Sequence, residues 1–288
     1  MIAKITLFFQ LLRPLQWSKN LFVLAPLFFS YRFTDIEAWK YALLSFVCFI
    51  VTSSYIYIMN DMHDAAQDRK HKQKKFRPIA SGKIGYAEAS LITIILFVIS
   101  ILILFALPIT CSVIIGIYVA FQAAYTYYLK KRAIIDVLII ASGFVLRVLM
   151  GGYAIDVPMS PWIILTTYLL ALFLGFGKRY HELSVDGYAD ARDSLKQYNK
   201  PLLDSLIGIS CVSALLSYAI YAVETARLLG KTELVYTVIF VIFGLFRYLQ
   251  VLYFDKEGGE PEKILLRDKT FFMNGLIWFS TVMCILLR

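Results

Sequence analysis

An acidic cluster with helical spacing is the feature of this sequence best suited to chemistry. Asn60, Asp64 and Asp68 follow one another at intervals of four residues, and Asp61 lies about 100° from Asn60 around a helix. All four side chains therefore share one side of a helix, where like charges repel unless a cation lies between them. Mg²⁺ prefers such oxygen ligands and also takes phosphate oxygens from a substrate. The pattern predicts a Mg²⁺ site, with a solvated acidic helix end as the alternative.

A basic run follows directly after the acidic cluster. Seven Lys and Arg residues lie between Arg69 and Lys83. Alone, such a run suits an anionic lipid surface. Beside the carboxylates it also suits a diphosphate, whose oxygens would contact metal and cations in turn. Because Arg can bind phosphate in a bidentate way, we expect Arg69 and Arg77 to bind substrate.

Membrane helices must position these residues. The 288-residue chain is 59% apolar and 17% charged, with a mean hydropathy of +0.68, which excludes an ordinary soluble enzyme. A helix needs about 20 apolar residues to span a bilayer. Long apolar blocks therefore predict an all-α polytopic membrane bundle of about nine transmembrane helices, forming one catalytic domain over residues 1–288. The blocks are Leu21–Phe33, Ala38–Met59, Ala87–Pro108, Ile109–Leu129, Ala133–Ile155, Pro161–Gly177, Leu202–Val223, Leu234–Phe254 and Thr270–Leu287.

The distribution of basic residues predicts the orientation of the bundle. With nine spans and the N-terminus inside, 22 of the 29 Lys and Arg residues fall on the cytoplasmic side and 5 on the other. Basic loops favour the cytoplasm, so we expect an integral protein of a bacterial cytoplasmic membrane whose charged loops face inward. The net charge of +9 is then mostly a topology signal, and nucleic acid is not an expected partner. The oligomeric state stays open, with a homo-oligomer as one option.

Polar and sulfur-bearing residues inside the blocks are a second source of information. A charge such as that of Arg147 costs at least about 2.5–3.5 kcal/mol at the centre of a span, so its side chain should face the bundle interior or a wet cavity. Structural pairing and a role in the site are equal alternatives for it. Arg247 lies within the eighth block. The four cysteines lie far apart in apolar blocks and are expected to be buried structural thiols.

The motifs together resemble those of a known family. Asn60–Asp68 with Arg77–Gly82, and the Tyr-rich stretch Tyr125–Arg132, are similar to signatures of the UbiA prenyltransferase superfamily. Its members are nine-helix intramembrane enzymes that use a Mg²⁺-bound diphosphate. The resemblance implies that Asp61, Asp64 and Asp68 are catalytic and that, with Asn60, they ligate the metal. It also implies that Asn60, Tyr125 and Lys130 contact substrate.

Three further stretches resemble one branch of this superfamily. Arg13–Asn20, Gly177–Tyr198 and Gly259–Asp268 are similar to segments of decaprenyl-phosphate phosphoribosyltransferases. That branch implies phosphoribosyl diphosphate as donor and a polyprenyl phosphate, held in the lipid bilayer, as acceptor. We accordingly expect Lys19 to orient the acceptor as a catalytic residue. In the second loop, the residues expected to bind substrate are Lys178, Arg179 and Glu182, the two cations holding the ribose 5-phosphate.

Two other functions are weighed against phosphoribosyl transfer. A standard prenyltransferase would move a polyprenyl group from its diphosphate to an aromatic or other acceptor, and composition alone does not separate the two enzymes. A transporter is less favoured, because both charged loops fall on one side and the halves show no convincing repeat. The sequence thus predicts a Mg²⁺-dependent transferase that moves phosphoribose to a polyprenyl phosphate and releases diphosphate.

Overall fold

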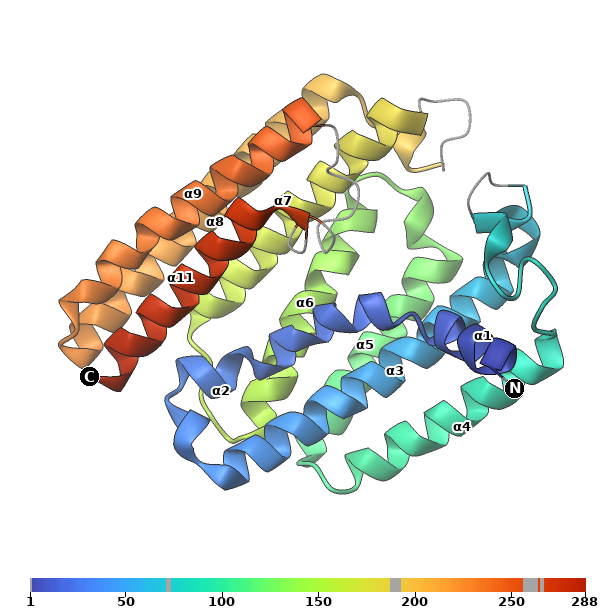
Figure 1. The fold of residues 1–288 in the computed structure, drawn as a ribbon, viewed down its shortest axis with the longest axis horizontal. Coiled ribbons are helices and arrows are strands. Elements are labelled where there is room, and N and C mark those ends of the chain that lie inside the picture. Colours follow the sequence, from blue (N-terminus) through green and yellow to red (C-terminus); the bar gives the residue numbers. More distant parts are fainter. Residues whose placement is uncertain (1, 71–73, 187–192, 256–263, 265–266) are drawn as a thin grey trace. The chain divides into compact units, whose positions relative to one another are not determined.

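The described part of the chain is built from helices. The computed structural model describes residues 2–70, 74–186, 193–255, 264 and 267–288, and every regular element in these ranges is helical (Figure 1). Within these described ranges, eight helices are long and apolar enough to cross a membrane. The chain falls into two compact units. Unit 1 comprises residues 1–126 and 146–158, and unit 2 comprises residues 127–145 and 159–288.

Unit 1 is organised along one long helix. Its α3 begins after the N-cap Asp35, whose side chain accepts hydrogen bonds from the backbone amides of Glu37 and Ala38. At 1.5 Å per residue its 33 residues extend about 50 Å, whereas a hydrocarbon core is about 30 Å thick. The acidic end of α3 therefore reaches beyond the apolar layer.

The elements of unit 1 are α1 (Ile2–Leu12), η1 (Pro14–Leu24), α2 (Ala25–Phe29), η2 (Arg32–Thr34), α3 (Ile36–Asp68), η3 (Lys74–Phe76), α4 (Tyr86–Leu104), α5 (Ile109–Tyr127, to residue 126) and the end of α6 (Ile135–Ala154).

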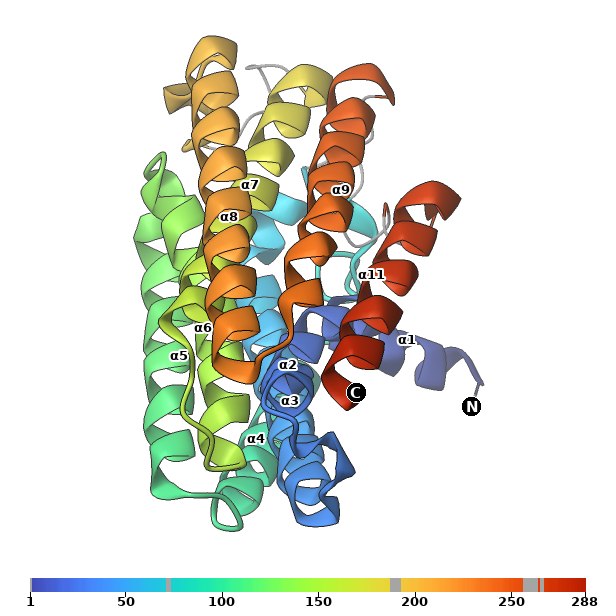
Figure 2. The same cartoon turned by 90° about the vertical axis from the view of Figure 1, so that its left-hand side faces the viewer.

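Unit 2 is centred on the pair α7 and α8, which lie side by side (Figures 1 and 2). Phe173 and Phe176 of α7 are buried with Leu203 and Ile207 of α8 and with Tyr248 of α9. These apolar contacts hold the helices that carry the second charged loop. Its elements are η4 (Leu129–Lys131), the start of α6, α7 (Pro161–Asp186), η5 (Leu195–Gln197), α8 (Lys200–Leu229), η6 (Thr232–Thr237), α9 (Val238–Gln250), the π-helical η7 (Val251–Asp255) and α11 (Lys269–Leu287).

Eight of the nine predicted blocks coincide with the eight candidate spans, and the first block differs. Leu21–Phe33 is not one helix, because the 3₁₀ helix η1 runs to Leu24 and α2 ends at Phe29. Pro26 lies at the start of α2 and has no N–H to continue a preceding helix. Tyr31 then takes a left-handed conformation with φ 63°, which ends the helical run.

The cysteines agree with the sequence prediction at three of four positions. Cys48, Cys111 and Cys211 are buried in the two units. Cys284, near the end of α11, is exposed, because that helix shows much of its surface within the described structure.

Candidate active site

Two buried carboxylates near the end of α3 form the centre of the site in unit 1. The Asp61 and Asp68 residues are 3% and 4% exposed, and a separation of seven residues places them on the same face of the helix. The Nη1 atom of Arg77 donates both to Asp61 Oδ1 at 3.0 Å and to Asp68 Oδ2 at 2.6 Å. Arg13 donates a second charge-assisted hydrogen bond to Asp61 Oδ1. Two arginines therefore neutralise two buried carboxylates, and this pairing offsets the cost of burying their charges.

The loop that follows η3 is built to aim Arg77 at this pair. The amides of Ser81, Gly82 and Ile84 donate to the carbonyls of Arg77, Ile79 and Pro78, at 2.9–3.1 Å. Ile79 and Ile84 are buried in one cluster with Ile58 and Ala65 of α3, which fixes the turn against the helix. Gly82 closes the turn at φ 74°, a conformation that favours glycine.

Arg13 reaches Asp61 from the junction between α1 and η1. It is left-handed, with φ 54°, and Pro14 starts η1 directly after it. The preceding Leu11 and Leu12 are buried in the same cluster as Ile58, and the Arg13 guanidinium lies 5.4 Å from the centre of the Tyr57 ring. The sequence places Arg13 at the start of a family-like motif, but nothing in it indicates the partner Asp61, 48 residues away.

The other predicted ligands of the acidic face take different environments. Asn60 accepts a hydrogen bond from the hydroxyl of Thr126, near the end of α5, and is half-buried. Asp64 is also half-buried. Within the described ranges, no three His, Cys, Asp or Glu side chains form a group that could hold a metal ion unaided. The structure thus brings together Asp61 and Asp68, with Asn60 and Asp64 on adjacent turns of the same helix.

Three more predicted site residues also belong to unit 1. Arg69 is exposed, and its Nε donates to the carbonyl of Ala80 at 3.1 Å, so it braces the loop that carries Arg77. Lys19, on η1, donates to Gln16 Oε1 at 2.6 Å and is half-buried. Tyr125 is half-buried on α5, next to the Thr126 that binds Asn60.

A buried ionic network lies where α7 leads into the second charged loop, in unit 2. Arg179 Nε donates to Asp136 Oδ2 at 2.9 Å, and its Nη1 donates to Glu182 at 2.8 Å. Ser194 and Tyr198 also donate to Asp136, at 3.2 and 2.9 Å. Burial and the neighbouring Asp136 raise the pKa of the Tyr198 hydroxyl above its ordinary range, which keeps that hydroxyl protonated.

This network changes the interpretation of the predicted ribose-phosphate residues. The Arg179 side chain is 3% exposed and occupied by two carboxylates, so it holds the loop rather than presenting a guanidinium to a ligand. Lys178, on the same turn of α7, is half-buried, as is Lys130 of η4. Residues 187–192 of the stretch that resembles the phosphoribosyltransferases lie outside the described residues.

Arg247 has a structural partner, which the sequence had left open. Its Nε and Nη2 donate to Asp268 Oδ2 at 3.0 and 2.6 Å, and Asp268 in turn caps α11 through the amide of Phe271. Desolvation alone would raise the pKa of Asp268, but these hydrogen bonds outweigh it and lower the pKa below its ordinary value.

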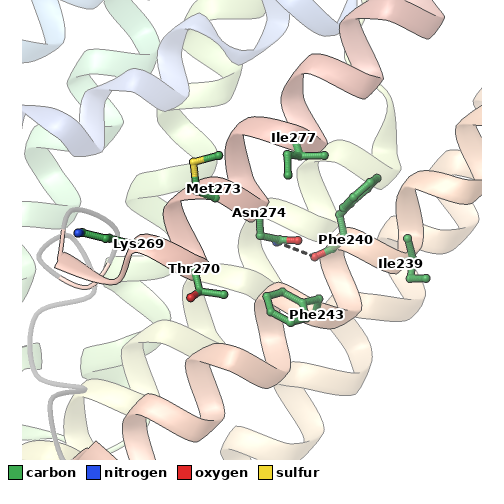
Figure 3. A pocket seen from close by; sticks show the side chains of 8 residues that line it. All are labelled: Ile239, Phe240, Phe243, Lys269, Thr270, Met273, Asn274 and Ile277. Carbon is green, nitrogen blue, oxygen red and sulfur yellow. Dashed lines mark hydrogen bonds between the residues drawn. The ribbon is translucent and has the colours of Figure 1, made fainter.

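A shallow groove elsewhere in unit 2 has no acidic residue among those that line it. It lies between α9 and α11, where Phe240 and Phe243 face Met273, Asn274 and Ile277 (Figure 3). Asn274 donates to the carbonyl of Phe240 at 2.9 Å and so ties the two helices together. The groove is almost wholly apolar and offers no carboxylate pair.

Comparison with known proteins decides the family. The sequence model of the UbiA prenyltransferase family matches residues 21–276. The chain belongs to this family. Its relatives include the decaprenyl-phosphate phosphoribosyltransferase of Mycolicibacterium smegmatis, 34% identical over 94% of this chain and 89% of that protein. The enzyme of the same name from Corynebacterium glutamicum is 32% identical over 95% of this chain and 85% of its own.

Solved UbiA structures share the fold. A UbiA homolog from Archaeoglobus fulgidus, bound to GPP and Mg²⁺, aligns with a TM-score of 0.71 over 98% of this chain and all of that one, at 16% identity. A digeranylgeranylglyceryl phosphate synthase aligns with a TM-score of 0.66 over 98% of each chain, at 19% identity. Family, fold and apolar helices together make this protein an integral membrane transferase of the UbiA family.

Proposed function

We propose that this UbiA protein transfers phosphoribose from phosphoribosyl diphosphate to a polyprenyl phosphate and releases diphosphate. The observation that carries the proposal is the identity of 32–34% to enzymes named decaprenyl-phosphate phosphoribosyltransferase, over about 94% of this chain. We take residues 1–288 as one catalytic domain, with its charged loops and N-terminus on the cytoplasmic side.

The acidic face of α3 supports a site for the diphosphate. Asp61 and Asp68 both accept from one nitrogen of Arg77, so their oxygens converge on a single point. A divalent ion can take the place of this Arg77 nitrogen once the arginine turns to the diphosphate, because Mg²⁺ uses one or two carboxylates and completes its shell with phosphate oxygens and water. Asp61 and Asp68 would hold the ion, with Asn60 and Asp64 beside them. When bound, Mg²⁺ would offset the charge that develops on the leaving diphosphate.

Arginines supply the second half of this diphosphate site. Arg77 and Arg13 are already aimed at the carboxylates, and phosphate oxygens can replace carboxylate oxygens as their acceptors. The bond between the anomeric carbon and the diphosphate oxygen breaks, while a bond forms from that carbon to an oxygen of the lipid phosphate. A phosphate monoester is already ionised at pH 7, so Lys19 needs only to orient it, and positioning supplies most of the catalysis.

The remaining sequence candidates complete the proposed substrate contacts. Lys178 is the cation of the second loop proposed to bind the ribose 5-phosphate, with Arg179 as the residue that holds its helix turn. Tyr125, Lys130 and Glu182 are proposed as further substrate contacts. The polyprenyl tail would extend from the site into the bilayer.

The direct test is transfer of label into lipid. Purified protein is incubated with Mg²⁺, polyprenyl phosphate and labelled phosphoribosyl diphosphate, and label is measured in the organic phase. We expect labelled lipid from the intact protein, loss of the signal with EDTA, and recovery with added Mg²⁺. Asp64→Asn and Asp68→Asn should abolish turnover, while Asp204→Asn, an exposed carboxylate of α8, should retain it. Near-normal rates in both acidic-face variants would contradict the assignment of the metal.

Prenyl transfer is the second candidate, because UbiA homologs have been solved with GPP or DMAPP and Mg²⁺. Calorimetric titration with phosphoribosyl diphosphate and Mg²⁺ separates the two. Under the first proposal, Lys178→Ala loses a charge-assisted contact worth about 1.5–3 kcal/mol, so affinity falls about tenfold or more. If the intact protein binds no sugar diphosphate and instead uses a polyprenyl diphosphate with an aromatic acid, prenyl transfer is the function.

A further inference from the structure

Arg147 is a buried cation that the proposed chemistry does not use. It lies twelve residues into α6, about 18 Å along that helix, and is 4% exposed. Its Nε donates to Asn20 Oδ1 at 2.8 Å and its Nη2 to the Tyr118 hydroxyl at 3.0 Å. The rings of Phe49 and Tyr118 lie 5.1 and 5.0 Å from the guanidinium. A mid-span charge is costly to insert, so this one should serve a purpose.

The contact with Asn20 connects α6 to η1 and α3. Asn20 is fully buried, and its Nδ2 donates to Ser53 Oγ at 3.1 Å, while that hydroxyl donates to the Ile50 carbonyl at 3.1 Å. The Asn20 amide and the Ser53 hydroxyl each donate and accept within this chain of hydrogen bonds, an arrangement that strengthens its members in a low-dielectric interior. The side chain of Asn20 is therefore held from two sides.

A steric contact one turn along α6 acts on the same part of η1. A Cβ atom at Gly151 would lie 1.9 Å from the Val23 carbonyl oxygen and 2.9 Å from its carbon. The two backbones thus touch, and any side chain at this position would push η1 away from α6.

The conformation of η1 needs such support. It is an 11-residue 3₁₀ helix, whereas 3₁₀ runs longer than three or four residues are uncommon because their hydrogen bonds are poorer. Its first half is secured separately, because Trp17 Nε1 donates to the Leu12 carbonyl and to Ser54 Oγ, at 3.1 and 3.2 Å. Its second half, which carries Lys19, is secured by Asn20 and the close approach of Gly151.

We propose that Arg147 and Gly151 are positioning residues that hold the second half of η1 and thereby place Lys19 for the lipid acceptor. The inference rests on the proposed function, in which Lys19 orients the acceptor phosphate. It assigns the two halves of η1 different roles. The first half presents Arg13 to the diphosphate end of the site, and the second presents Lys19 to the acceptor.

The test compares substitutions that break the link to Asn20 with one that keeps it. Asn20→Leu preserves volume but removes both hydrogen bonds, and Arg147→Gln removes the cation. Each should raise the KM for polyprenyl phosphate at least tenfold, while the affinity for phosphoribosyl diphosphate changes less than threefold. Asn20→Asp still accepts from Arg147, and the Ser53 hydroxyl can turn from the Ile50 carbonyl to donate to the new carboxylate, so this variant should keep a KM near that of the intact protein.

Gly151→Ala acts sterically on η1 and so tests the same inference independently of the hydrogen bonds of Asn20. It should raise the acceptor KM in the same way, whereas Gly116→Ala, where nothing lies within 4 Å of the added carbon, should not. Thermal unfolding of every variant identifies those that remain folded. If the folded Asn20→Leu and Gly151→Ala variants keep the normal acceptor KM, or if both substrates lose affinity equally, the inference is wrong. Failure of the intact protein to bind phosphoribosyl diphosphate would instead reject the proposed function.

Discussion

Replacing Asp136 by Asn tests whether the buried network of unit 2 holds its loop. Asp136 is fully buried and accepts hydrogen bonds from Arg179, Ser194 and Tyr198. Removing one partner of a buried ion pair costs about 3–5 kcal/mol, because the remaining charge is left uncompensated. Arg179 keeps its bond to Glu182, so we expect the lower end, about 3 kcal/mol. For a protein of this size that corresponds to a fall in Tm of roughly 6–12 °C.

A thiol-reactive fluorogenic dye can measure this change in detergent. Cys211 is buried in unit 2 and reacts only on unfolding, while the exposed Cys284 is first replaced by Ser to remove its background. At a fixed scan rate, Asp136→Asn should melt well below the parent protein. Asp204→Asn, which loses one exposed hydrogen bond from Tyr253, should shift Tm by less than about 2 °C. Equal midpoints for the two variants would refute the reasoning.

Three other outcomes follow from local geometry. Gly82→Ala forces a side chain into a left-handed turn and should destabilise the protein by about 1–2 kcal/mol, measured by dye unfolding, while the helical Gly116→Ala should not. The pKa of Tyr198 is raised in the folded protein, so the protonated hydroxyl stabilises the fold below about pH 10 and this stabilisation is lost as pH rises further. Tyr198→Phe should therefore reduce the fall of Tm with rising pH above about pH 10. The pKa of Asp268 is lowered in the folded protein, so its carboxylate stabilises the fold above about pH 4 and this stabilisation is lost as pH falls below that value. Arg247→Gln should therefore reduce the acid loss of Tm between about pH 5 and about pH 2, and an unchanged acid loss would contradict the pairing.

Helix positions could be predicted well because apolar blocks report directly on membrane spans. Eight blocks overlap the candidate spans of the described structure, although α3, α7 and α8 continue six to nine residues beyond the ends of their apolar blocks. The segment at Leu21–Phe33 could not be predicted in this way, because its 3₁₀ start packs against Gly151, more than a hundred residues away, through Val23, and the adjoining Asn20 accepts from Arg147. Composition reports that a segment is apolar, but not which helix type its neighbours impose.

The candidate site was predictable as far as local spacing reaches. The acidic face of α3 and the basic loop with Arg77 are each contained in a few consecutive residues. Arg13 pairs with Asp61 across 48 residues, and Arg179 pairs with Asp136 across 43. One sequence alone does not indicate which residues pair when they lie so far apart in the chain. The sequence shows Arg179 only as a cation of the second loop, whereas the structure shows that it is buried and paired with Asp136 and Glu182.

The balance of charges at the end of α3 bears on how the protein is made. Asp61 and Asp68 are matched by Arg13 and Arg77, so this part of unit 1 carries its own counter-ions. A zinc finger, by contrast, stays unfolded until its metal arrives. Here the newly synthesised chain can enter the membrane and fold before any divalent ion or diphosphate is present. If the proposed Mg²⁺ site is correct, a cell short of magnesium would accumulate folded but inactive protein, which would become active when the ion returns.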